Sequence, residues 1–138
     1  MAINAKLFVD GCNPLGYNLI TCEYEINKKI DNNGKPYAYP RGGLIDFSFQ
    51  TQNDVDDIKF HEWVINKNER KGGRVEFDLS GGGKSKPKML VFKYAHCIHL
   101  NEKFNSQIKE QMITSIRISA AIISFGGLEY KNNELLSE

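Results

Sequence analysis

The feature that most constrains the fold is an alternation of apolar and polar residues along most of the chain. Successive side chains of a β-strand point to opposite faces, so this period-two pattern predicts strands with one buried face. The residues expected on the buried faces are, in chain order, Ile3, Ala5, Leu7 and Val9; Ile20, Cys22, Tyr24 and Ile26; Ile45, Phe47 and Phe49; Val75, Phe77 and Leu79; Leu90, Phe92, Tyr94, His96 and Ile98; and Met112, Ile116, Ile118, Ala120 and Ile122. Six strands are therefore predicted.

One segment departs from the alternation and predicts a helix at about residues 56–67. Phe60 and Trp63 are three residues apart, which places both on one helix face. The Asn and Asp residues of 53–57 are suited to cap the N-terminal end. We expect Gly72–Gly73 to end the helix and Trp63 to anchor it in the core.

Alternating strands around a single helix predict a mainly β protein, an antiparallel β-barrel or closed sandwich with one α-helix. The sequence lacks the repeated helix crossovers of a parallel sheet. With 138 residues the chain has the size of one domain, 1–138, in which 126–138 is either a flexible or a specialised tail. Turn-forming residues are dense at 31–36, which predicts an extended loop or a long hairpin there.

Composition excludes several classes of protein. The 18 basic and 17 acidic residues leave a net charge of +1, so no net field attracts nucleic acid or an anionic membrane, and self-association is permitted. No segment approaches the ~20 apolar residues of a membrane-spanning helix, and the start of the sequence lacks the pattern of a signal peptide. Three cysteines, an odd and sparse set, predict reduced thiols in the cytoplasm rather than a disulfide scaffold.

Gly81–Ser85 has the glycines and the lysine of a phosphate-binding loop. The full motif requires a glycine where Asp78 stands, and a helix after the loop. The pattern after Pro87 predicts a strand instead. A flexible hairpin linker is the better interpretation.

Cys97 and His99 are the next candidates for chemistry, because residues two apart on a strand share a face. Zinc usually requires three or four protein ligands, which His61 or Cys22 would have to complete. A Cys–His nucleophile requires a base at hydrogen-bond distance and a thiol of lowered pKa, and no local motif supports either. We therefore predict no metal site, no cofactor and no catalytic residue.

Two charged clusters also have simpler interpretations. Asp54, Asp56 and Asp57 lack the glycine and the distal glutamate of a calcium loop, so helix capping explains them. Lys84, Lys86 and Lys88 lack the interleaved aromatic residues of a nucleic-acid interface, which favours a solvated loop.

The order of the segments, more than any one of them, resembles the Hcp (TssD) family of type VI secretion tube proteins, in its Bacteroidetes branch. The segments that carry the resemblance are Ala5–Gly11, Cys22–Ile26, Gly34–Pro36, Arg41–Ile45, Phe60–Trp63, Gly73–Phe77, Leu90–Phe92 with Ala95 and His96, and Ile116–Ser119. Together they span nearly the whole chain.

The resemblance implies a barrel that forms hexameric rings, and rings stacked into a tube that a contractile sheath expels without a signal peptide. It implies effector cargo in the lumen, other secretion components as partners, and no catalytic residues. The loop implied at an inter-subunit contact comprises Asp31, Asn32, Asn33, Gly34, Lys35 and Pro36. A Cys12–Gly16 insertion and the tail beyond Phe125 depart from the family pattern and bear on stacking.

The residues leave one alternative, a monomeric β-barrel that binds a small ligand or peptide. Its pocket would be walled by the aromatic side chains of the strands. Those side chains are Tyr24, Phe47, Phe49, Phe92 and Tyr94.

Overall fold

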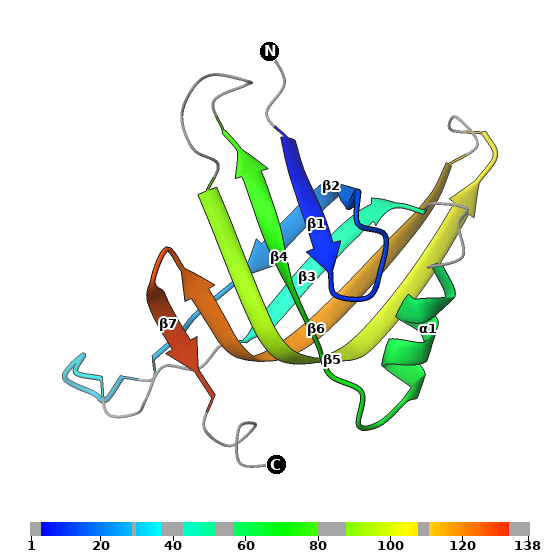
Figure 1. The fold of residues 1–138 in the computed structure, drawn as a ribbon. Coiled ribbons are helices and arrows are strands. Elements are labelled where there is room, and N and C mark those ends of the chain that lie inside the picture. The colour runs from blue at the N-terminus through cyan, green and yellow to red at the C-terminus, as the bar shows by residue number, and fades with distance from the viewer. Residues whose placement is uncertain are drawn as a thin grey trace.

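The computed structural model describes residues 4–28, 30–36, 43–51, 57–79, 88–107 and 111–132. These residues form seven strands and one helix (Figure 1). In chain order the elements are β1 (Asn4–Val9), β2 (Tyr17–Tyr24), β3 (Leu44–Gln50), α1 (Asp57–Ile65), β4 (Lys71–Asp78), β5 (Lys88–Asn105), β6 (Gln111–Phe125) and β7 (Leu128–Lys131). No helix among the described residues has both the length and the apolar character to cross a membrane.

The sheet closes on itself to form a barrel. Its strand order is β3-β2-β1-β4-β5-β6-β7, and a further pairing of β3 with β6 closes the ring of six strands. All of these pairs are antiparallel. Helix α1 packs against β5 (Figure 1), and its Phe60 ring lies 5.2 Å from the core rings of Tyr17 and Phe49. The predicted class, a mainly β barrel with one helix, is confirmed.

The core lies inside the barrel and under the helix. Phe47, Phe49, Phe92, Phe60 and Trp63 are all at most 2% exposed. The indole Nε1 of Trp63 donates a hydrogen bond to the carbonyl oxygen of Ala95 at 3.0 Å, which satisfies its only polar group. Trp63 is the core anchor that the sequence predicted.

Alternation located β1 and β3 correctly. Leu7 and Val9 of β1 are buried, and so are Ile45, Phe47 and Phe49 of β3. The helix lies inside the predicted range of 56–67. Asp57 is the one residue of the predicted capping segment 53–57 that lies among the described residues. Of Lys84, Lys86 and Lys88, the described residues include Lys88 alone. The glycine-rich linker Gly81–Ser85 lies outside them.

The two long strands do not keep one face inward, which corrects the predicted pattern. In β5 Phe92 is buried, but the next buried residue is Ala95, so Tyr94 points outward at 52% exposure. In β6 Ala120 and Ala121 are both buried, and Ile123 replaces Ile122 as the buried residue that follows. These switches lie opposite one another in the β5–β6 register, and Tyr94 has a φ of 53°. Both strands bend there together, which turns the sheet over the core.

Two β-bulges lie at two further residues that the sequence pattern had placed inside. The β2–β3 register shifts between Leu19 and Thr21, so Ile20 is exposed rather than buried. The β5–β6 register shifts between Cys97 and His99, and Ile98, which lies between them, is 51% exposed. A bulge inserts one unpaired residue and reverses the faces beyond it, which the alternation of residue types does not reveal.

Gly72 and Gly73 do not end the helix, which stops at Ile65; they lie inside β4. A Cβ at Gly73 would lie 2.2 Å from the carbonyl oxygen of Phe8 and 2.6 Å from the Phe92 ring. Glycine is needed there because backbone and ring approach so closely.

The predicted tail contains a further strand, which makes seven strands rather than six. Gly126 and Gly127, both at positive φ, turn the chain so that Leu128–Lys131 pairs with the end of β6. A two-residue turn with positive φ at both positions suits a β-hairpin. The last six residues, 133–138, lie outside the described part.

Candidate functional site

The barrel interior is packed rather than hollow. The rings of Tyr17 and Phe49 have centroids 5.1 Å apart, and those of Phe47 and Phe92 are 6.0 Å apart. Of the aromatic residues proposed to wall a pocket, Phe47, Phe49 and Phe92 fill the core instead. Tyr94 points to solvent. This packing argues against a ligand held inside the barrel.

The candidate pair Cys97 and His99 is separated by the bulge at Ile98. Cys97 faces the core, whereas His99 is exposed on the opposite side of β5. Burial raises the pKa of the Cys97 thiol to about 11, so the thiol keeps its proton at neutral pH. The prediction that these side chains share a face is wrong, and the thiol is not activated.

His61 belongs to a polar chain that joins the helix to the β5–β6 hairpin. Its Nε2 lies 3.0 Å from Oε1 of Glu102, and the Thr114 hydroxyl donates to Oε2 of Glu102 at 2.8 Å. Thr51 and Thr114 hydroxyls are 2.5 Å apart. Within the described ranges, no three His, Cys, Asp or Glu side chains group as a metal site.

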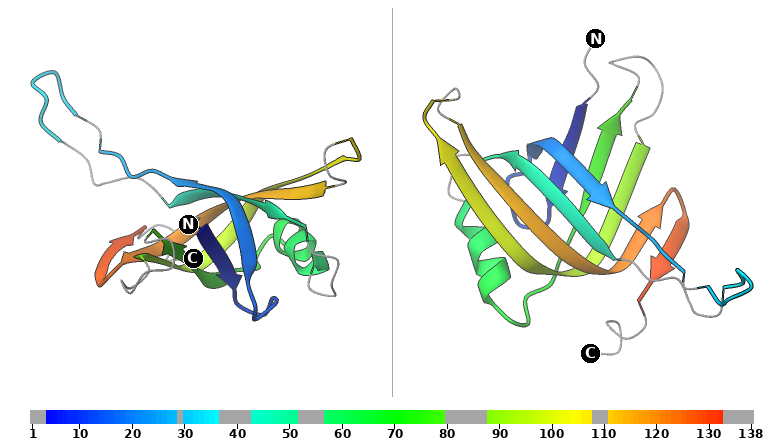
Figure 2. Two further views of the ribbon diagram at one scale, coloured as in Figure 1. Left: turned by 90° about the horizontal axis from the view of Figure 1, so that it is seen from above. Right: turned by 180° about the vertical axis from the view of Figure 1, so that it is seen from behind.

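Four adjacent strands, β5, β6, β3 and β2, present an outer surface that we call the open face. The right-hand view of Figure 2 looks onto it, and no other described element lies in front of it. Side chains directly opposite one another across paired strands share a face, so the registers define rows across this surface. Ser115, Arg117 and Ser119 of β6, which alternate with the buried residues of this strand, lie here.

One row of the open face is charged and another carries hydroxyl and amide groups. The charged row is His99, Arg117, Asp46 and Glu23. The neutral row is Asn101, Ser115, Ser48 and Thr21, in which the Thr21 and Ser48 hydroxyls are hydrogen-bonded. A surface of this kind stays hydrated, because none of these groups is apolar.

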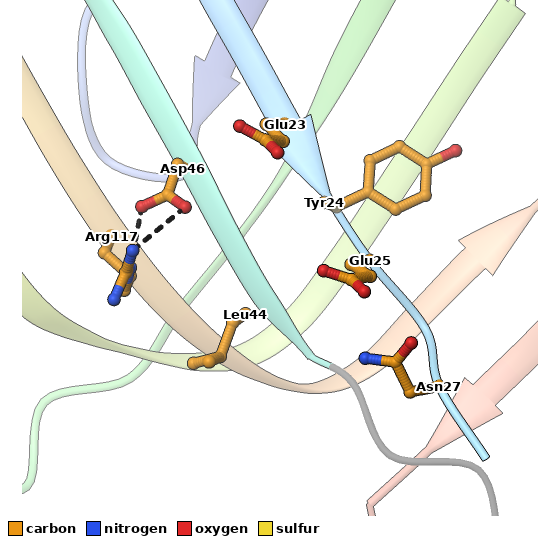
Figure 3. Close-up of a pocket in the computed structure, with 7 residues that line it drawn as sticks. All are labelled: Glu23, Tyr24, Glu25, Asn27, Leu44, Asp46 and Arg117. Atoms are coloured by element: carbon orange, nitrogen blue, oxygen red, sulfur yellow. Dashed lines mark hydrogen bonds and ion pairs between the residues drawn. The ribbon is translucent and has the colours of Figure 1, made fainter.

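An ion pair lies at the centre of the charged row. Nε of Arg117 donates to Oδ1 of Asp46 at 2.7 Å, and its Nη2 donates to Oδ2 at 3.3 Å (Figure 3). These hydrogen bonds raise the pKa of the Arg117 guanidinium. The pair borders a shallow pocket of about 440 Å³. Its other lining residues are Glu23, Tyr24, Glu25, Asn27 and Leu44.

Beyond β2 the chain forms an ordered turn that we call the Ile30 loop, residues 30–36. Ile30 and Pro36 form an isolated antiparallel bridge. Oδ1 of Asp31 accepts hydrogen bonds from the backbone N–H groups of Asn33, at 2.8 Å, and Lys35, at 3.0 Å. The N–H of Gly34, at a φ of 84°, donates to the Asp31 carbonyl oxygen at 3.0 Å. The predicted contact loop is therefore held in shape by its own hydrogen bonds.

The Ile30 loop projects away from the barrel, as both views of Figure 2 show. Ile30 is 61% exposed at its base.

A second concave surface lies where α1 ends, and we call it the helix-end groove. Its volume is about 500 Å³. Val64, Asn66, Lys67 and Asn68 form one wall, and His96–Ile98 of β5 forms the other. Sequence reasoning missed this groove, because it depends on the outward position of Ile98, which the alternation pattern had placed in the core.

A filled antiparallel barrel with one packed helix, an ordered projecting loop and a groove at the helix end defines the structural class of this protein. The family described as Hemolysin coregulated protein Hcp (TssD) matches residues 1–133. The chain belongs to this family, as the resemblance predicted, and is thus of the type VI secretion tube-protein kind.

Solved structures agree with this assignment. Hcp1 from Flavobacterium johnsoniae has a TM-score of 0.79 and 28% sequence identity, covering 94% of this chain and 99% of its own. Hcp1 from Salmonella typhimurium, at 9% identity and a TM-score of 0.64, covers 88% of this chain and 85% of its own, and shares the fold. A chain of the anti-feeding prophage baseplate also shares the fold, at 10% identity and a TM-score of 0.52. The match covers 91% of this chain and 92% of the baseplate chain. A comparison with curated proteins gave no match.

Proposed function

We propose that this protein is a structural subunit of the inner tube of a type VI secretion system, which assembles into hexameric rings that stack. The observation that carries the proposal is the match to the Hcp family over residues 1–133, with the same fold as F. johnsoniae Hcp1 at 28% identity. Proteins that share the fold include a type VI secretion system protein and a type VI secretion system effector from Yersinia pestis. Residues 1–138 act as one domain.

In this proposal the open face lines the lumen of the tube. Its charged and hydroxyl rows favour water over apolar contacts, so polar cargo can pass without adhering. The packed interior supports association rather than ligand binding as the activity. The subunit carries no catalytic residue and needs no cofactor. It assembles in the cytoplasm and leaves the cell within the secretion machine, with effector cargo and other machine components as partners.

The Ile30 loop is the proposed inter-subunit contact. Asp31, Asn32, Asn33, Gly34, Lys35 and Pro36 form an ordered turn that projects from the barrel. Because the turn is ordered before contact, less conformational entropy is lost on binding.

Light scattering and negative-stain imaging of the purified chain test the proposal. We expect ring-shaped particles with a central hole and a mass of about six subunits. A strictly monomeric species at high protein concentration would contradict the tube function.

A further inference from the structure

We infer that the helix-end groove is the receptor for the Ile30 loop of a second copy of this chain. The inference rests on the proposed role of the loop as an inter-subunit contact. The inference adds to that role the surface that receives the loop, and it names the side chains of loop and groove that contact each other.

The loop offers an apolar side chain beside a negative charge. Ile30 is 61% exposed, and Asp31 follows it directly. Oδ1 of Asp31 holds the turn, whereas Oδ2 has no hydrogen-bond partner among the described residues. The turn thus holds the apolar side chain of Ile30 next to the free carboxylate oxygen of Asp31.

The groove offers the complementary pair. Val64 and the bulged Ile98 are its aliphatic residues, and Ile98 is 51% exposed although it lies on a barrel strand. Lys67 stands at the rim with Asn66 and Asn68, which carry both donors and acceptors. Burial of Ile30 against Ile98 removes two exposed isoleucines from water, and Lys67 can pair with the Asp31 carboxylate.

The two features lie at opposite ends of the molecule. In Figure 1 and in both views of Figure 2 the loop and helix α1 are on opposite sides of the barrel. A loop therefore reaches the groove of another copy, not its own. Such a contact is head-to-tail, and a head-to-tail contact generates a ring if the rotation closes. The open face lies between loop and helix in the right-hand view of Figure 2, so every copy in such a ring turns this face the same way.

Charged substitutions test the contact. Ile30→Asp and Ile98→Asp are each expected to shift the protein from rings to monomers in light scattering, because each buries an unpaired carboxylate in the contact. Ile58→Asp is the matched control: Ile58 is 62% exposed, at the other end of α1, and rings should persist. Rings that survive Ile30→Asp at wild-type abundance would overturn the inference.

Cross-linking gives a readout that does not depend on destabilisation. In an Ile30→Cys, Asn68→Cys double variant, a short bis-maleimide should join copies into a ladder of multimers in denaturing gels. Ile30→Cys combined with Ile58→Cys should give no ladder above the wild-type background from Cys12, Cys22 and Cys97. Rings without the specific ladder would overturn the receptor assignment but leave the tube function standing. A wild-type chain that forms no ring would instead refute the tube function.

Discussion

The inner and outer faces of the same strands differ sharply. In β3 the inward residues Ile45, Phe47 and Phe49 are at most 2% exposed, whereas Asp46 and Ser48 between them belong to the rows of the open face. The inner face is apolar and tightly packed, so its substitutions should change the stability of the fold. The outer residues Asp46 and Ser48 form their hydrogen bonds with other side chains of the open face, so their substitution should leave the fold intact. Within one strand, the inward residues should therefore determine stability, and the outward residues belong to the surface that is available for assembly.

The largest expected effect comes from emptying the interior. Phe92→Ala should lower the free energy of unfolding by about 3–5 kcal/mol, because Phe92 is fully buried and its removal leaves a cavity. Phe104→Ala, at a phenylalanine of the same strand that is 63% exposed, is the control and should change it by less than about 0.5 kcal/mol. Urea denaturation measures both. Equal losses would remove the distinction between the two faces.

The next effect tests how tightly the interior is closed. Gly73→Ala should cost about 1–3 kcal/mol, because the added methyl overlaps the Phe8 carbonyl oxygen and the Phe92 ring. Gly34→Ala meets no neighbouring atom but places a side chain at a φ of 84°, so it should strain the Ile30 loop and leave the unfolding midpoint of the barrel nearly unchanged. A tolerated Gly73→Ala would show that β1, β4 and β5 are less closely packed than described.

The pH dependence of stability should also distinguish the buried interior from the exposed face. Burial raises the pKa of Cys97 from 9.0 to about 11, and burial with the Asp46 charge does the same for Cys22. The folded chain therefore binds more protons than the unfolded chain between pH 9 and pH 11, so stability falls as pH rises through this window. Cys97→Ala should flatten that decline relative to wild type in denaturation series. An unchanged slope in this variant would place the thiol in a more hydrated site.

The smallest effect is expected on the open face. Asp46→Asn removes the carboxylate that pairs with Arg117 on a surface where both side chains are close to half exposed. Exposed ion pairs contribute little and are screened by salt, so the loss should be slight at low ionic strength and vanish at high salt. Thermal unfolding at two salt concentrations measures this. A large, salt-independent loss would mean that the open face supports the fold as well.

The sequence predicted the class of fold and much of the core, for reasons that particular residues make clear. β3 and the helix were located correctly because their apolar spacing is regular and local. Ile116 and Ile118 of β6 are buried as their alternation predicted. The contact role of residues 31–36 stays a prediction, although their turn chemistry is confirmed by the hydrogen bonds of Asp31.

The errors lie where the backbone departs from regular strand geometry. Ile20 and Ile98 were placed inside, but bulges expose them. Ile122 and Tyr94 were assigned to the wrong face because β5 and β6 bend together at Tyr94. A bulge or bend changes the face of every residue beyond it, while residue types alone record only the spacing.

The sequence by itself determined that this chain is a strand-rich barrel with one helix, because alternation and its single interruption are local patterns. Only the tertiary structure decided where Ile98 points, that the helix end forms a groove, and that this groove lies opposite the Ile30 loop. These features depend on how distant strands pair and bend, and such pairings follow from packing of the whole chain rather than from any one segment.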